Sequence, residues 1–537
     1  MRVTKYPPNA NRQAGESPFQ MAQIFFVINF PEQTDLRYYN IIMKLIRFFA
    51  PRIEYILFAA IFWGTIASGP RILNFDGDLP RHLLVGDLIL QTRHVSLVDD
   101  FSFRTVGYPS IPHEWLAQVI FAGAKNIFGL NGVVLLTGII LTLTWGMVYY
   151  DTARRSKDFF ITLVILALAI GAGQLHVLPR PHLFTYLLTA VWVILIERID
   201  ESNTRAWGWL PLVMLVWVNL HGMFVIGIII WGIYLTGDFL DHPSKIWLAS
   251  AKAKALITGG IFALAATLFS PSGARIWEAI ASLGSNAYIT SKIPEYQSAN
   301  FHLPETWLFI LILSLTLIGF ARAADKLPWA HILMVVAFAG VALYSSRMIP
   351  LFAIASAPIT AKALADWIRK EYPESRLSVI ERNVARINAS SNGFIWIPIV
   401  VIMVALLLQS GKAIDPENRG NIFDNRFFPV EAATWLQMHP QQGHMFNEFD
   451  WGGYLLLRLW PDQQVFMDGH THIYGETLTR EYEQVISLGK GWENILAKYH
   501  VEWVIMHSNA PLINALVSSE NWAIAYQDQT AVILIRR

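Results

Sequence analysis

The segment that follows the first long apolar run contains two carboxylates and an imidazole at short spacing. Asp76 and Asp78 are two residues apart, and His82 follows Asp78 by four residues. If a helix begins at Leu79, Asp78 occupies its N-cap position and Pro80 its first turn, both favoured places. His82 then lies one turn above Asp78 on the same face. A carboxylate so placed is able to act as a general base on a hydroxyl group; the alternative is a helix cap without chemical function.

The same three residues form a candidate site for a divalent metal ion, because carboxylate oxygens and imidazole nitrogens are common metal ligands. Three ligands so close in the chain are a weak pattern. The cofactor is therefore unknown from the sequence, with a divalent metal ion at Asp76, Asp78 and His82 as the candidate.

His113 and Glu114 continue this stretch and precede an amphipathic run from Trp115 to Ile127. Such a run is typical of a helix that lies along a membrane surface. Glu114 either caps that helix or binds a substrate together with His113, and the sequence leaves both interpretations open.

Further polar residues stand at the ends of later apolar runs. Ionisable groups at membrane depth are costly, so they usually face a cavity and a partner. Each alone is compatible with a structural role, whereas one polar cavity opening outward accounts for all of them. Arg180 and Arg347 carry the planar guanidinium that matches phosphate bidentately. The candidate substrate-binding residues are His82, His113, Glu114, Arg180, His182, Asn219, His221, Glu295 and Arg347.

The elements that must position these residues are membrane-spanning helices. The 537-residue chain is 54% hydrophobic and 15% charged, whereas soluble domains carry roughly 25% charged residues. Apolar runs that approach the ~20 residues needed to cross a bilayer predict about eleven spans. They are 53–69, 131–150, 159–175, 182–197, 207–220, 223–237, 255–270, 305–321, 328–344, 348–366 and 394–410.

Basic residues are unevenly distributed between the loops that join these runs. With the N-terminus inside, every loop predicted inside is basic, as at Arg154 and Arg155, while the short outside loops after the first hold few Lys or Arg. This asymmetry follows the positive-inside rule. An odd number of spans then places the C-terminus outside. We expect a multi-pass protein of the plasma (inner) membrane with a cytoplasmic N-terminus.

The chain divides into three predicted regions: a cytoplasmic tail at 1–52, a transmembrane domain at 53–410 with a large outer loop at 70–130, and an extracytoplasmic domain at 411–537. Strands alternate with helices in the last region, which is typical of a small α/β domain. The predicted strands are 465–467, 501–506, 522–526 and 531–535, and the predicted helices are 429–438, 477–485, 492–499 and 511–517.

Two motifs stand out in this last region. Gly452 and Gly453 permit a tight turn. Asp468 and Gly469 follow a predicted strand, where loop residues often bind ligands. Turn chemistry alone is the alternative for both motifs, and the sequence favours it slightly.

Composition also excludes several functions. The chain has no cysteine, which excludes disulfides, Cys nucleophiles and thiolate metal sites. A net charge of +1 gives no support for a nucleic-acid partner.

The acidic outer loop resembles that of the GT-C superfamily of membrane glycosyltransferases, near the protein O-mannosyltransferase and aminoarabinose-transferase-like group of bacterial proteins. Those proteins place an Asp, usually followed by Glu, with Tyr or His about four residues on, in the first outside loop. Asp78 and His82 match this spacing. Leu79 stands where the second acid would be, and Asp76 offers an Asp-x-Asp arrangement instead. The resemblance is strongest over residues 74–116.

The resemblance implies an enzyme that moves a hexosyl or pentosyl group from a polyprenyl-phosphate donor to an acceptor hydroxyl of a lipid, glycan or protein on the outer face. It implies Asp78, with Asp76, as catalytic residues, and a carrier phosphate near Arg180 or Arg347. Two alternatives remain. One is a non-catalytic relative, which Leu79 keeps open. The other is a lipid or solute transporter, which predicts inverted repeats that the sequence does not show.

Overall fold

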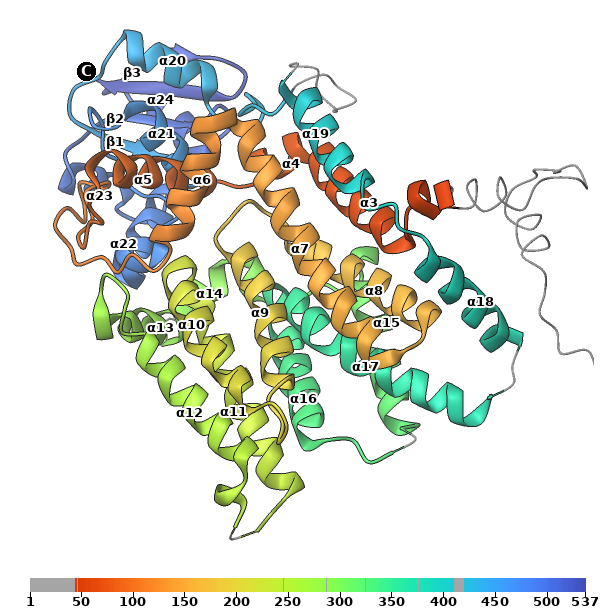
Figure 1. Ribbon diagram of the computed structural model, residues 1–537. Coiled ribbons are helices and arrows are strands. Elements are labelled where there is room, and N and C mark those ends of the chain that lie inside the picture. Colours follow the sequence, from red (N-terminus) through yellow and green to blue (C-terminus); the bar gives the residue numbers. More distant parts are fainter. Residues whose placement is uncertain are drawn as a thin grey trace, which may run out of the picture.

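The computed structural model describes residues 44–537 apart from 46, 245, 286, 324, 374–375 and 410–419. Most of the predicted cytoplasmic tail (residues 1–43) and the predicted junction after residue 410 lie outside the described residues. The described chain forms a bundle of long helices with a small α/β domain, residues 420–537, at one end (Figure 1). Helices α5 and α6 of the first outer loop lie between the two parts.

A helix coincides with every predicted span. These helices are α3 (Ile53–Ala67), α7 (Leu130–Ser156), α8 (Phe159–Gly173), α9 (His182–Glu197), α10 (Trp209–Leu220), α11 (Val225–Asp241), α12 (Ala251–Ala266), α15 (Trp307–Ala321), α16 (Trp329–Tyr344), α17 (Ile349–Glu371) and α19 (Trp396–Gln409). In the described part of the chain, 6 helical segments are long and apolar enough to cross a membrane. The polytopic helical architecture is confirmed, while the exact number of crossings stays a prediction.

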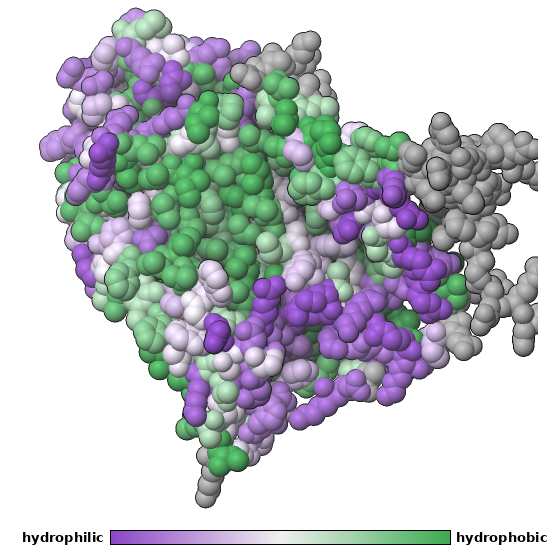
Figure 2. Space-filling view, in the orientation of Figure 1, coloured by the Kyte–Doolittle hydropathy of each residue, from purple (hydrophilic) through white to green (hydrophobic). Residues whose placement is uncertain are grey.

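Many of these helices are apolar on their outer as well as their inner faces. Leu143 of α7, Val164 of α8 and Ile229 of α11 are exposed, while Trp192 and Trp217 are fully buried. Figure 2 shows a continuous hydrophobic area on this face of the bundle, bordered by hydrophilic surface where the α/β domain lies. A helix that is hydrophobic all round and still exposed belongs in lipid.

Helix α17 occupies the centre of the bundle, where it packs against α7, α8, α15 and α16. Small side chains such as Ala353, Ala357 and Ala361 are fully buried along it. Small residues let helix backbones approach closely within a membrane. The segment just before α17 carries Arg347, so the packing of α17 fixes the position of that side chain.

The predicted helix at Leu79 and the predicted amphipathic helix at Trp115 are confirmed as α5 (Leu79–Thr92) and α6 (Trp115–Phe128). They pack closely at Gly86, where an added Cβ would lie 2.1 Å from the carbonyl oxygen of Gln118. Leu83 of α5 belongs to the core of the bundle, and Leu84 belongs to the core of the α/β domain. Helix α5 therefore connects the two parts.

The α/β domain is built on a four-stranded sheet with the order β1-β2-β4-β3. Strand β1 pairs with β2 in parallel, and the other pairs are antiparallel. The strands are β1 (His444–Asn447), β2 (Val501–His507), β3 (Trp522–Gln527) and β4 (Ala531–Arg536), and the helices are α20 (Val430–Met438), α21 (Gly452–Leu459), α22 (Thr471–Ile486), α23 (Trp492–Lys498) and α24 (Pro511–Val517). Alternate residues of β2, such as Trp503 and Val504, enter two separate cores, as the two-residue period of a strand requires.

Three expectations for this domain are wrong or incomplete. The predicted strand at 465–467 is absent from the described structure, in which Val465 makes one isolated bridge with Ser102. Strand β1 and helix α21 do not follow from the sequence pattern. Gly452 and Gly453 begin α21 instead of forming a turn. An added Cβ on Gly453 would lie 2.7 Å from the carbonyl oxygen of Gly77, so these glycines allow α21 to approach the acidic loop.

Candidate functional site

Asp76 and Asp78 share one guanidinium group. Arg180 Nε donates to Asp76 Oδ1 at 2.7 Å, and Arg180 Nη1 lies 3.0 Å from Asp78 Oδ2. The backbone N–H of Asp78 donates to Asp76 Oδ1 at 2.9 Å, which fixes the two carboxylates relative to each other. The Asp76 side chain is 0% exposed and that of Asp78 is 30% exposed. Asp78 is therefore the carboxylate that a substrate can reach.

Asp78 occupies the N-cap position of α5, but in the described structure its side chain makes no capping hydrogen bond. The carboxylate turns toward Arg180 instead. The interpretation of Asp78 as only a helix cap is therefore wrong. Leu79, which stands in place of a second acid, is fully buried among apolar side chains and contributes no polar group.

Glu295 joins Arg180 to Arg347. Arg347 Nη1 donates to Glu295 Oε1 at 3.1 Å, and Arg180 Nη1 lies 3.8 Å from the same oxygen. Glu295 Oε2 lies 3.3 Å from His176 Nδ1. Short 3-10 helices carry three of these residues: η1 (Gln174–His176), η6 (Pro294–Tyr296) and η8 (Ser346–Met348). The two arginines predicted to hold a phosphate are thus brought together by one carboxylate.

Glu114 lies among imidazoles from three separate segments. Its Oε2 is 3.9 Å from His82 Nδ1, and its Oε1 is 3.9 Å from His113 Nε2 and 3.5 Å from His221 Nε2. Glu114 occupies the N-cap position of α6, yet in the described residues its side chain makes no capping hydrogen bond. The capping interpretation is wrong here as well, and four predicted site residues meet at this point.

His182 and Asn219 contact neighbours of the same cluster. His182 Nε2 is 3.3 Å from the carbonyl oxygen of His176, and the two rings are 4.4 Å apart. Asn219 Oδ1 accepts a hydrogen bond from Trp115 Nε1 at 2.8 Å, which ties the end of α10 to the start of α6. All predicted site residues therefore gather at one end of the bundle.

Burial and charge set the protonation of two of these carboxylates. Burial raises the pKa of Asp76 to about 6, against the lowering effect of Arg180 and with a further raising effect of Asp78. Burial also acts to raise the pKa of Glu114, but His113 and His82 outweigh it and the pKa falls to about 2. Glu114 is therefore a fixed anion near neutral pH, while Asp76 exchanges a proton at mildly acidic pH.

The α/β domain contacts the acidic loop directly. Arg81 Nε of α5 donates to Asp468 Oδ2 at 2.8 Å, and Arg81 Nη2 lies 3.1 Å from His470 Nδ1. Gly469 stands beside Asp78, and an added Cβ at position 469 would lie 1.7 Å from Asp78 Oδ1. The motif at Asp468 and Gly469 therefore reaches the carboxylate that the sequence predicts to be catalytic.

Arg81 and His472 lie at the candidate site and were not singled out from the sequence, whereas His470 ends the motif that contains Asp468 and Gly469. The His472 ring lies 5.4 Å from the ring of His113 and 3.9 Å from that of His470. The one signal that points to His472 is its position two residues after His470. Arg81 has no such signal, because one Arg in an amphipathic helix is usually exposed.

Several buried polar atoms of the cluster have no hydrogen-bond partner among the described residues. Such atoms are rare in folded proteins and costly to bury unpaired. They are Asp76 Oδ2, His176 Nε2, His182 Nδ1, Arg347 Nε and His472 Nε2. They come from distant parts of the sequence and gather at one place, as expected of a site that receives a polar ligand.

The candidate metal ligands do not converge. Asp76 and Asp78 are occupied by Arg180, and His82 turns toward Glu114. Among the described residues, no group of three or more His, Asp or Glu has an arrangement that could hold a metal ion. Asp76, Asp78 and His82 therefore do not fit the predicted metal site.

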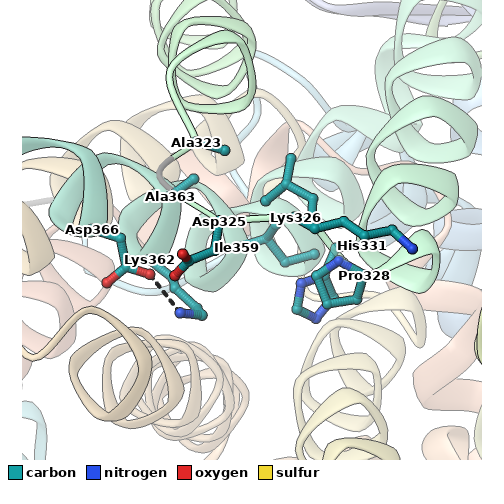
Figure 3. A pocket seen from close by; sticks show the side chains of 10 residues that line it. Ala323, Asp325, Lys326, Pro328, His331, Ile359, Lys362, Ala363 and Asp366 are labelled. Carbon is teal, nitrogen blue, oxygen red and sulfur yellow. Dashed lines mark hydrogen bonds and ion pairs between the residues drawn. The ribbon is translucent and has the colours of Figure 1, made fainter. Parts of the chain in front are cut away.

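A separate pocket lies at the opposite end of α16. Its lining includes Lys326, His331, Lys362 and Asp366, with Lys362 paired to Asp366 (Figure 3). Helix α16 has 16 residues, which gives it a length of about 24 Å. His331 lies in its first turn, and Arg347 follows its last residue by three positions. None of the predicted site residues lines this pocket.

Solved structures share the fold of this chain. The apo oligosaccharyltransferase of Archaeoglobus fulgidus matches with a TM-score of 0.53 and 12% identity, over 84% of this chain and 69% of that chain. The same protein, AglB, in complex with an inhibitory peptide and a dolichol-phosphate, matches with a TM-score of 0.52 and the same identity and coverage. ArnT from Cupriavidus metallidurans, bound to undecaprenyl phosphate, gives a TM-score of 0.47 at 13% identity, over 89% of this chain and 97% of that chain.

No protein-family model and no curated protein matches the chain. At 12% identity, the AglB similarity establishes the fold and nothing finer. The chain is a polytopic helical membrane protein with a small C-terminal α/β domain, and it shares its fold with AglB.

Proposed function

We propose that this chain is an integral membrane glycosyltransferase. It moves a sugar from a polyprenyl-phosphate-linked donor to an acceptor hydroxyl on the outer face of the inner membrane. The fold shared with AglB, which was solved with a dolichol-phosphate, supports a lipid-phosphate donor. The residues support it independently, since the partly exposed Asp78 contacts Arg180, and Glu295 links Arg180 to Arg347.

The observation that carries the proposal is the contact of Arg180 with both Asp76 and Asp78. A guanidinium between two carboxylates holds Asp78 in a fixed orientation. Asp78 is partly exposed and is therefore the proposed base, whereas the buried Asp76 is a positioning residue that holds Arg180. This pairing compensates for Leu79, which stands where the related enzymes carry their second acid.

The proposed reaction is a direct displacement. The acceptor oxygen attacks the anomeric carbon of the donor sugar, and its proton passes to a carboxylate oxygen of Asp78. The bond between the anomeric carbon and the phosphate oxygen breaks, and its electron pair leaves with the polyprenyl phosphate. Arg347, whose Nε has no partner among the described residues, binds the departing phosphate together with Arg180, because guanidinium groups stabilise phosphate charge.

The orientation in the membrane is part of the proposal. The basic loops favour a cytoplasmic N-terminus and put residues 411–537 outside, where they form an extracytoplasmic domain over the site. A lipid, glycan or protein acceptor then approaches from the outer side. The polyprenyl chain lies along the hydrophobic surface of the bundle.

Transfer by the purified protein tests the proposal. The protein in detergent is incubated with undecaprenyl phosphate carrying radiolabelled glucose, mannose or arabinose, and with a membrane extract as acceptor. We expect label to leave the carrier for one of these sugars. Label that stays on the carrier throughout would contradict the proposal and favour a non-catalytic relative or a transporter.

A further inference from the structure

We propose that Glu114, together with His113 and His472, binds hydroxyl groups of the donor's sugar ring. This subsite is separate from the phosphate subsite at Arg180 and Arg347. The inference rests on the proposed function and adds to it the part of the site that recognises the sugar.

The Glu114 side chain is 20% exposed, and no described residue donates a hydrogen bond to it. Its side-chain oxygens lie 3.5–3.9 Å from the nearest imidazole nitrogens, and they accept no hydrogen bond from the residues that the structure describes. An ionised carboxylate offers only acceptor positions. Its strongest partners are O–H or N–H donors, and the hydroxyl groups of a sugar ring supply several of them in a small volume.

Two of the three surrounding histidines, His113 and His82, do not supply a donor to Glu114. His113 Nδ1 lies 2.9 Å from the carbonyl oxygen of Ile111 and must carry the proton of that hydrogen bond. In the neutral ring, His113 Nε2 is then an acceptor. His82 Nδ1 lies 3.2 Å from Gln118 Nε2, an amide donor, and is likewise an acceptor. His113 Nε2 faces Glu114, so two neighbouring hydroxyl groups of a sugar ring are able to donate one hydrogen bond to the carboxylate and one to this nitrogen.

His472 brings the α/β domain to the same place. Its ring lies 5.4 Å from that of His113, and its Nε2 is buried without a partner among the described residues. Burial lowers the pKa of His472 to about 3, with a further lowering effect of His113 and Arg81. The ring is therefore neutral at pH 7 and able to accept or donate one hydrogen bond to a hydroxyl group.

The position of Glu114 suits a sugar attached to the bound phosphate. His82 links Glu114 to the segment of the proposed base: its Nδ1 lies 3.9 Å from Glu114 Oε2, and its backbone N–H donates to the carbonyl oxygen of Asp78 at 3.1 Å. The charge of Arg347, the proposed phosphate ligand, also acts on Glu114. A sugar ring between phosphate and base would meet its carboxylate.

Comparing the binding of two lipids tests this subsite. The full-length protein in detergent is titrated with bare undecaprenyl phosphate and with undecaprenyl phosphate carrying glucose, mannose or arabinose. We expect Glu114→Gln to weaken binding of the sugar-bearing lipid by about 10- to 100-fold, the loss expected for a hydrogen bond to a charged group. His472→Ala should weaken it by roughly 2- to 10-fold, the loss expected for a hydrogen bond between neutral groups. Binding of the bare lipid should stay unchanged.

Two controls make the result specific. His302→Ala removes an exposed histidine of the loop before α15 and should change neither affinity. Arg347→Met should weaken both lipids. Unchanged thermal unfolding of Glu114→Gln, or partial recovery with Glu114→Asp, separates lost recognition from lost folding.

The possible outcomes are distinct. If Glu114→Gln weakens both lipids equally, or neither, the sugar subsite is contradicted while the transferase proposal stands. If the parent binds none of the lipids, both the proposed function and the sugar subsite are contradicted.

Discussion

Gly469 of the C-terminal α/β domain stands against the carboxylate of Asp78, so closely that an added Cβ would lie 1.7 Å from Oδ1. Beside this contact, Arg81 and Asp468 form a buried ion pair across 387 positions of sequence. The end of the chain therefore helps to position the carboxylate that we propose as the catalytic base.

Gly469→Ala should reduce transfer by on the order of 10²-fold, because displacing a reacting group by about 1 Å has that effect. The added methyl group must push Asp78 away or move the loop that carries Gly469. Gly123→Ala in α6 is the matched control, since an added Cβ there meets nothing within 4 Å. The test compares the initial transfer rates of Gly469→Ala and Gly123→Ala. Equal rates would show that this contact does not set the position of Asp78.

Asp78→Asn should fold normally and lose transfer by roughly 10²–10⁴-fold, the contribution of a positioned general base. Asn is accepted about as well as Asp at the N-terminus of a helix, so a role confined to the start of α5 predicts almost no change. Thermal unfolding and transfer are measured on the same preparation.

The Asp76→Asn variant is the comparison for Asp78→Asn. If Asp76→Asn has the larger effect on turnover, the acidic loop contains the catalytic base, but the base is Asp76. If both variants transfer at the parent rate, the catalytic role of this loop is wrong.

Asp76 should give opposite pH dependences of stability and activity. Its pKa is raised from 3.8 to about 6 in the folded protein. Between these values the folded state binds the proton more tightly than the unfolded chain, so this residue adds to the free energy of unfolding as pH falls. Protonation also removes the charge that holds Arg180, so transfer should decline over the same window.

Thermal unfolding midpoints and transfer rates measured from about pH 7 to about pH 4 test whether stability and transfer change in these opposite directions. The midpoint difference between parent and Asp76→Asn should change in favour of the parent as pH falls through about 6. A difference that stays constant over the whole range would show that Asp76 does not titrate there.

Residues 411–537 should lie outside the cytoplasm. A phosphatase reporter fused after Arg537 in a bacterial host is expected to be active, because this enzyme folds only after export, whereas the same reporter after Lys157 should be inactive. The basic inside loops give the reason. Activity after Lys157 and none after Arg537 would invert the topology and place the acidic cluster on the cytoplasmic side.

Much of the helical architecture follows from local sequence. Long apolar runs must cross lipid as helices, because no water is present there to bond the backbone. Each predicted span therefore coincides with a helix, including short ones such as α10. Leu79 also begins a helix as its neighbours predict. In the α/β domain, β2 and β4 follow from dense apolar runs, while β1 and α21 do not, because a four-residue strand and a helix beginning with two glycines carry little local signal.

The gathering of the site at one end of the bundle could also be expected, since Asp78, Arg180, Glu295 and Arg347 all stand at ends of apolar runs on the same predicted side. The partners of the individual side chains could not be predicted from the sequence. Asp78 and Glu114 each have the sequence context of a helix cap, and both side chains turn away to partners on other helices.

The sequence by itself determined which segments form helices and at which end the polar residues collect, because hydrophobic length and charge act locally along the chain. Only the tertiary structure decided that Arg180 joins Asp76 to Asp78, that imidazoles surround Glu114, and that Gly469 meets Asp78. Those contacts depend on how α5, α6, α9 and the α/β domain pack against one another, and packing between distant segments has no period or spacing in the sequence from which it can be read.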